Sequence, residues 1–183
     1  MEINPYLNLL KLTLVITIFS YLVELFFPII NNLSDTNAIG LFIFRYTHFI
    51  SFIYFVSFLF LFNYKGSDAL IYLIIAVVVL SSWKVFNCCI LSYYELKMYN
   101  VKHNNYLTTF HPCLFVLFRG YQEIVLYLMG VITAFTVYLI LFKNKIIPIQ
   151  YKLFLGIAFT YLIIDNLIQT RFLNKNLNYP KEL

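Results

Sequence analysis

The chain has 183 residues, of which 62% are hydrophobic and 11% are charged, and its mean hydropathy is +0.81. Soluble domains carry about 25% charged residues, so a soluble core could not absorb this much apolar surface. The formal net charge of +5 does not indicate nucleic-acid binding, because the basic residues are scattered over loops and tails. Contact with the anionic headgroups of a lipid bilayer accounts for this charge, and we expect no nucleic acid as a partner.

The apolar residues form continuous runs, about twice as long as the alternating strands of ~10 residues that build a transmembrane β-barrel. Runs of about 20 apolar residues have the length of a transmembrane helix. The sequence therefore predicts an all-α fold, an integral membrane helical bundle with about five transmembrane helices. No internal repeat is visible, so we expect residues 1–183 to form a single multi-pass transmembrane domain.

Polar connections separate the expected helices. NNLSDTN at residues 31–37 and NYKGSD at residues 63–68 have the composition of turns and helix caps. Residues 143–150 form a basic connection that contains a proline. With these boundaries, the expected spans cover residues 12–30, 38–62, 69–92, 121–142 and 152–172.

Two segments do not fit the pattern of a simple span. The chain is polar from Lys97 to Pro112, and this is the longest expected loop. The segment CLFVLF at residues 113–118 is apolar but too short to cross a bilayer alone. We expect residues 113–118 to be interfacial or re-entrant.

Several spans carry ionisable side chains, and their depths can be compared by using a rise of about 1.5 Å per residue. Glu24 and Asp165 each lie about 13 residues into their spans, which places them roughly 20 Å from one face. Arg45 lies near the start of the second span, which begins at the opposite face, so it reaches a similar depth in the bilayer. The expected members of a polar network or pathway in this layer are Glu24, Arg45, His48, Lys84, Asn87, Glu123 and Asp165.

Helical spacing supports the idea that these side chains face inward. The first span carries a polar stripe formed by Thr13, Thr17, Ser20 and Glu24. The third span carries another stripe formed by Ser81, Lys84, Cys88, Ser92 and Glu95. Because a charge facing lipid costs several kcal/mol, the stripes are expected to face each other or a watery cavity, with Glu24 or Asp165 as the partner of Lys84.

Three functions remain open at this level. The first is a structural or accessory membrane protein whose buried polar network specifies helix packing, in a homo-oligomer or with other membrane proteins. The second is a small transporter or a proton- or ion-conducting protein that uses the intramembrane charges, with His48 as a titrating group. The third is a membrane-embedded enzyme.

The chemistry-bearing residues match no motif of a known enzyme. Cys88, Cys89 and Cys113 lack the Cys-x-x-Cys spacing of thiol oxidoreductases, and they are better explained as small core residues or lipidation sites. His103 and His111 could approach Cys113, but their spacing does not match zinc-binding motifs. Only His48 lies in a span where it could ligate haem. We therefore expect no metal and no other cofactor.

One short motif resembles a known family. The segment CILSYYE at residues 89–95 resembles the Cys-Pro-Leu-Thr-x-x-Glu signature of a family of small multi-pass bacterial membrane proteins of unknown function. The residues that carry the resemblance are Trp83, Cys89, Ser92 and Glu95. His48 is similar to an early histidine of the family, and the segment after the long loop, 109–117, falls at a similar place.

The resemblance covers roughly residues 41–137, and it departs from the family pattern at several points. Ile90 stands in place of the signature proline, Lys84 lies near an acidic position, and the first and last helices are additional. The family implies a multi-pass membrane fold but offers no activity to transfer. The abundance of Asn, Ile, Lys, Phe and Tyr also resembles membrane proteins of giant DNA viruses, whose AT-rich genomes inflate these residue types.

Overall fold

The computed structural model describes residues 4–27, 38–86, 89–99 and 112–174, and every regular element among them is helical. The all-α fold class expected from the sequence is therefore confirmed. The elements are α1 (Pro5–Phe26), α2 (Ala38–Leu61), α3 (Asp68–Phe86), α4 (Ile90–Met98), α5 (Pro112–Phe118), the 3-10 turn η3 (Arg119–Tyr121), α6 (Gln122–Lys143) and α7 (Ile149–Asn174).

Four helices in the described part of the chain are long and apolar enough to cross a membrane. They are Pro5–Phe26, Ala38–Leu61, Asp68–Val85 and Ile124–Lys143. The fifth expected span, residues 152–172, falls within α7, which is 26 residues long but is not among those four. The crossing by α7 therefore stays a prediction.

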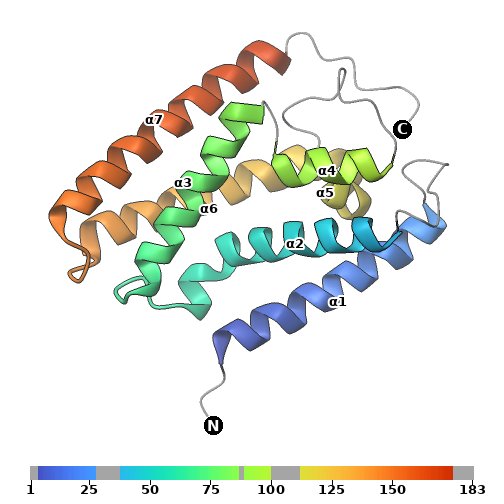
Figure 1. Ribbon diagram of the computed structural model, residues 1–183, viewed down its shortest axis with the longest axis horizontal. Helices are drawn as coiled ribbons and strands as arrows, with labels where there is room; N and C mark the ends of the chain where they lie inside the picture. Colours follow the sequence, from blue (N-terminus) through green and yellow to red (C-terminus); the bar gives the residue numbers. More distant parts are fainter. Residues whose placement is uncertain (1–3, 28–37, 87–88, 100–111, 175–183) are drawn as a thin grey trace.

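The long helices pack as two main pairs, α1 with α2 and α3 with α7. Helix α1 lies along α2, which also contacts α4 and α6, while α3 packs against α7. Figure 1 shows the α3–α7 pair on one side and the α1–α2 pair on the other, with α6 behind them. The short helices α4 and α5 lie together at the end of the bundle where α1 ends, so any site there combines segments far apart in the sequence.

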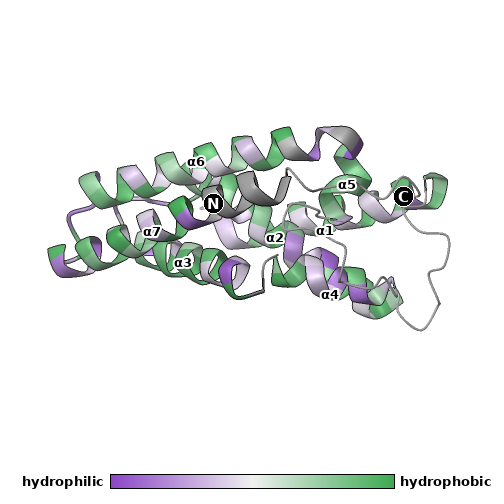
Figure 2. Cartoon of the chain, turned by 90° about the horizontal axis from the view of Figure 1, so that it is seen from above, coloured by the Kyte–Doolittle hydropathy of each residue, from purple (hydrophilic) through white to green (hydrophobic). Residues whose placement is uncertain are grey.

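Large apolar side chains cover the outside of the bundle. Leu25 is 77% exposed, Phe60 83% and Tyr127 73%. Figure 2 shows that the long helices are mostly hydrophobic along their length, whereas hydrophilic residues are prominent on α4 and in the α6–α7 connection. Monomeric soluble proteins rarely expose continuous apolar patches of this extent, whereas a lipid-facing surface requires them.

The interior between α2 and α3 is an aromatic cluster. Tyr72 of α3 lies against Phe58 with ring centroids 4.4 Å apart, and Tyr54 contacts the same two rings. Phe58 and Tyr72 are fully buried. The Tyr72 hydroxyl also lies 3.5 Å from the Phe55 carbonyl, which places its polar end near a backbone acceptor.

One buried asparagine joins the two connections at the same end of the bundle. Asn144, in the α6–α7 connection, donates through Nδ2 to the carbonyls of Tyr64 and Gly66 in the α2–α3 connection. Its Oδ1 accepts from the backbone N–H groups of Ile146 and Ile147. All four hydrogen-bonding positions of the amide are used, so Asn144 ties the two turns together.

The third expected span differs from the structure. Residues 69–92 do not form one helix, because α3 ends at Phe86 and α4 begins at Ile90. Cys89 has extended backbone angles, φ −65° and ψ 123°, and serves as the N-cap of α4. An extended residue cannot continue an α-helix, so Ser92 and Glu95 belong to a separate helix that runs in another direction (Figure 1).

The other boundaries differ less. Helix α1 begins at Pro5 rather than at residue 12, because Asn4 accepts a hydrogen bond from the Tyr6 N–H as N-cap and proline suits the first helical turn. The segment 113–118 lies in α5, whose seven residues are too few to cross a bilayer. Its position in the membrane interface stays a prediction.

Candidate functional site

Arg45 of α2 is fully buried, with no exposed surface. Its Nε donates to Glu95 Oε1 at 2.9 Å, and its Nη1 donates to Glu24 Oε2 at 2.7 Å. Its Nη2 donates to the Tyr99 hydroxyl. We call Glu24, Arg45, Glu95 and Tyr99 the Arg45 cluster.

The Arg45 cluster is closed by a further hydrogen bond and an aromatic face. The Tyr99 hydroxyl donates to Glu24 Oε1, so it connects the same carboxylate to the guanidinium by a second route. Burial raises the pKa of Tyr99, which keeps its phenol protonated as this donation requires. The Tyr21 ring lies 4.8 Å from the guanidinium carbon, in the geometry of a cation–π contact.

The chain folds so that three helices meet at this point. Glu24 lies near the end of α1 and Arg45 near the start of α2, and the antiparallel packing of the two helices brings them to the same level. Helix α4 crosses α2 there and contributes Glu95, while Tyr99 follows its last turn. Glu95 has no exposed surface.

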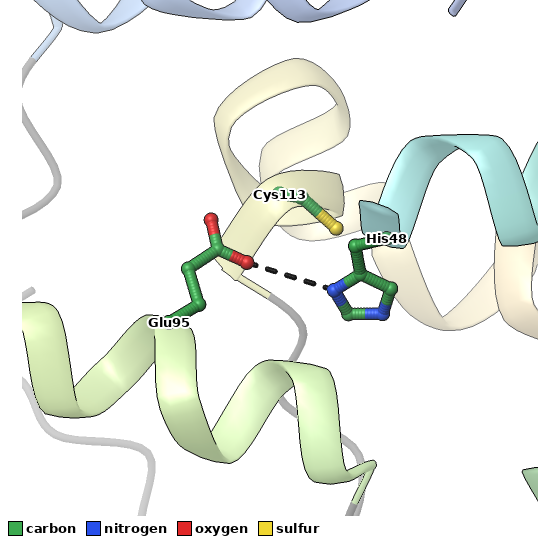
Figure 3. Close-up of side chains that lie close together, drawn as sticks. All are labelled: His48, Glu95 and Cys113. Atoms are coloured by element: carbon green, nitrogen blue, oxygen red, sulfur yellow. Dashed lines mark ion pairs between the residues drawn. The ribbon is translucent and has the colours of Figure 1, made fainter. Parts of the chain in front are cut away.

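A second group of side chains begins at the other oxygen of Glu95. Glu95 Oε2 lies 3.6 Å from His48 Nδ1, one helical turn from Arg45 on α2. The Cys113 Sγ, from α5, completes a triplet in which one ligand-type atom of each residue lies within 4.8 Å of the others. Figure 3 shows the three side chains converging from three elements, with the Cys113 sulfur pointing toward the imidazole. We call His48, Glu95 and Cys113 the His48 cluster.

The other imidazole nitrogen has a sulfur neighbour. Cys89 Sγ lies 3.5 Å from His48 Nε2, and both cysteines are buried. Burial raises the pKa of the Cys113 thiol, although His48 and Arg45 oppose this effect. Burial acts in the same direction on Glu95, but the contact with His48 and the charge of Arg45 outweigh it, so the Glu95 pKa lies below its usual value. A buried protonated thiol is a poor nucleophile, so this environment does not activate Cys113.

The remaining charges form a separate, more exposed pair. Lys84 Nζ lies 3.2 Å from Asp165 Oδ1 and donates to the Tyr161 hydroxyl. The two charged side chains are 35% and 24% exposed. Lys84 and Asp165 belong to α3 and α7, whereas the Arg45 cluster is built from α1, α2 and α4, so the expected polar layer is divided into two groups.

The polar stripe of α1 is its buried face. Thr13, Thr17 and Ser20 have no exposed surface. Their hydroxyls donate to carbonyls of their own helix, at Leu9, Thr13 and Thr17 respectively. These small residues therefore allow α1 to lie close to α2, and only Glu24 of this stripe is hydrogen-bonded to groups of other elements in the described residues.

Some expected site residues fall outside the described part of the chain. Asn87 and Cys88 lie in the gap between α3 and α4, and Glu123 lies in α6 with a side chain outside the description. Ser92 is buried on α4, three residues before Glu95, and Trp83 is partly buried on α3. The long-loop histidines His103 and His111 are also outside the described residues.

Sequence reasoning missed two contributors and underrated one. The sequence does not predict Tyr99 as a site residue, and it predicts Cys113 to be a small core residue or a lipidation site. Glu95 is predicted through the stripe of the third span and through the resemblance at residues 89–95, but neither predicts that both clusters share it. The helical spacing of polar residues within one span cannot predict these contacts. They depend on how α4 and α5 pack against α2.

No protein-family model, curated protein or solved structure matches this chain.

Proposed function

We propose that the protein is an integral membrane protein with a structural or accessory role, in which the Arg45 cluster specifies how α1, α2 and α4 pack. The observation that carries this proposal is that three different nitrogen atoms of one fully buried guanidinium donate to Glu24, Glu95 and Tyr99. Between helices surrounded by lipid tails, the hydrophobic effect provides little drive for association, so directional polar contacts define the register.

The geometry also supports this role over ion conduction. A conducting group needs access to water and room to exchange partners, whereas Arg45 and Glu95 have no exposed surface. Glu24 has a side chain that is 12% exposed and two oxygens already engaged by Arg45 and Tyr99. A closed network of this kind holds one arrangement of helices rather than passing a charge along.

Reconstitution tests the proposal directly. The wild-type chain and Glu24→Gln are purified in detergent, placed in liposomes under a pH gradient, and compared with empty liposomes. A structural role predicts no protein-dependent proton flux and a lower melting temperature for Glu24→Gln. A pH-dependent flux that Glu24→Gln abolishes, with an unchanged melting temperature, would overturn it.

Asp165→Asn is the matched control, because it removes a carboxylate from the more exposed pair. The proposal expects Asp165→Asn to lower the melting temperature less than Glu24→Gln does. An equal or larger effect at Asp165 would mean that the Arg45 cluster is not the main polar determinant of packing.

A further inference from the structure

We propose that His48, Glu95 and Cys113 bind a divalent transition metal of the zinc type, at the point where α2, α4 and α5 meet. This site is independent of the proposed structural role, since no metal is needed for the contacts of Arg45. The residues supply one nitrogen, one oxygen and one sulfur, each of which is a common ligand of Zn²⁺.

The geometry is close to that of a metal site. With bonds of about 2.0 to 2.3 Å at tetrahedral angles, neighbouring ligand atoms lie about 3.3 to 3.6 Å apart. His48 Nδ1 and Glu95 Oε2 are already 3.6 Å apart, and no pair in the triplet exceeds 4.8 Å. Coordination therefore requires the most distant atoms to approach by about 1 Å, which side-chain rotation can supply.

The carboxylate oxygen that faces this triplet is available for a ligand. Glu95 Oε1 accepts from Arg45, whereas Oε2 is buried and has no partner within hydrogen-bond distance among the described residues, since His48 Nδ1 lies 3.6 Å away. A buried carboxylate oxygen without a donor is costly, and a cation between Oε2 and Nδ1 would remove that cost. Arg45 would hold the carboxylate in place from the other side.

Cys89 orients the histidine rather than completing the ligand set. It lies beside Nε2, on the far side of the ring from the nitrogen that faces Glu95. A proton on Nε2 that is donated to Cys89 leaves the lone pair on Nδ1, as a ligand requires. Metal-bound histidines commonly donate their other ring N–H to an acceptor that fixes the tautomer and the ring orientation, and we assign this role to the Cys89 sulfur.

Charge supports a divalent ion. Two carboxylates, Glu24 and Glu95, share the single positive charge of Arg45, so the buried Arg45 cluster has one negative charge in excess. Binding releases the thiol proton of Cys113 to solvent, since a coordinated thiol is deprotonated. The ion and the Cys113 thiolate together carry one positive charge, and with His48 neutral, as coordination through Nδ1 requires, this balances the excess.

The test uses the full chain purified in detergent, stripped with a chelator and titrated with Co²⁺. We expect one Co²⁺ to bind per chain and to give a thiolate-to-cobalt charge-transfer band. Addition of Zn²⁺ should displace the Co²⁺ and abolish this band. Cys113→Ser should lose the band while keeping its helical circular dichroism. Cys89→Ala should keep the band with an affinity about 10-fold weaker or more. No band in the wild-type chain would overturn the proposal.

The long loop provides a control, because it carries two other potential ligands. The double variant His103→Ala/His111→Ala should bind Co²⁺ as the wild type does, and loss of the band in this variant would overturn the proposed site. X-ray absorption of the Zn²⁺-loaded wild type gives a readout that needs no variant. One sulfur ligand is expected, and none or two would contradict the assignment.

Discussion

Arg45 faces two carboxylates and one phenol in a site with no exposed surface. Removing one partner of a buried ion pair strands the others, and this typically costs about 3 to 5 kcal/mol. Arg45→Met should therefore lower the free energy of unfolding in detergent by about that amount. Thermal and denaturant unfolding, followed by circular dichroism, measure this change.

Arg45→Lys refines the test. A lysine keeps the charge but lacks the planar fork that reaches Glu24 and Glu95 at once. We expect its melting temperature to lie between those of the wild type and Arg45→Met. A lysine variant as stable as the wild type would show that charge alone, without the fork geometry, holds the cluster.

Lys84 is the contrasting residue, because it and Asp165 are both partly exposed. Exposed ion pairs contribute little to stability, since solvent screens them and ordering long side chains is costly. Lys84→Met should change the melting temperature much less than Arg45→Met does, in the same detergent. A change of equal size would contradict the separation into a buried and an exposed group.

At the scale of helices and turns, Asn144 contributes to the stability of the fold by joining the α2–α3 and α6–α7 connections. Replacement by alanine removes four hydrogen bonds and leaves the carbonyls of Tyr64 and Gly66 without this donor. At about 1 kcal/mol for each bond, Asn144→Ala should destabilise the protein by roughly 2 to 4 kcal/mol. Lys145→Ala, at an exposed neighbour in the same turn, is the control and should be nearly neutral.

The close packing of α1 on α2 predicts a difference between two substitutions at Thr17. Its hydroxyl donates only within α1, so Thr17→Val keeps the shape and should change stability by less than about 1 kcal/mol. Thr17→Leu adds volume at a position with no exposed surface and should cost about 1 to 3 kcal/mol. Equal effects in an unfolding experiment would mean that the hydroxyl, and not the close approach, matters.

The elements differ in how well the sequence predicts them. Hydrophobic length identifies α2 and α6 almost to the residue, because lipid requires a continuous apolar run. The same rule extends the third span through Cys89, since apolar composition alone does not reveal an extended residue there. The break matters for the site, because it creates a separate α4 that carries Glu95.

The depth of each residue, estimated from the helical rise, correctly predicts which charged residues of neighbouring helices lie at the same level. It placed Glu24 and Arg45 at one level, and the structure has them 2.7 Å apart. It placed Lys84 and Asp165 in the same layer, and these two residues are also paired. It could not separate the two groups or add Tyr99 and the α5 cysteine, since these depend on how α4 and α5 dock.

For the whole molecule, four helices with exposed apolar faces predict tight association with lipid. The expressed chain should stay in the membrane pellet after extraction with alkaline carbonate, which releases peripheral proteins, and should require detergent for release. A chain found in the carbonate supernatant would contradict the membrane-spanning arrangement. Cell fractionation followed by immunoblotting gives this result directly.

The central claim is that a buried ionic network fixes the packing of three helices, and a double-mutant cycle tests it most directly. Arg45→Met, Glu95→Gln and the double variant are unfolded in one detergent with a chelator present, so that metal binding does not contribute. The account predicts that the double variant loses less stability than the two single losses combined, with a coupling of about 0.5 to 3 kcal/mol. Strictly additive losses would show that Arg45 and Glu95 do not stabilise each other, and would contradict it.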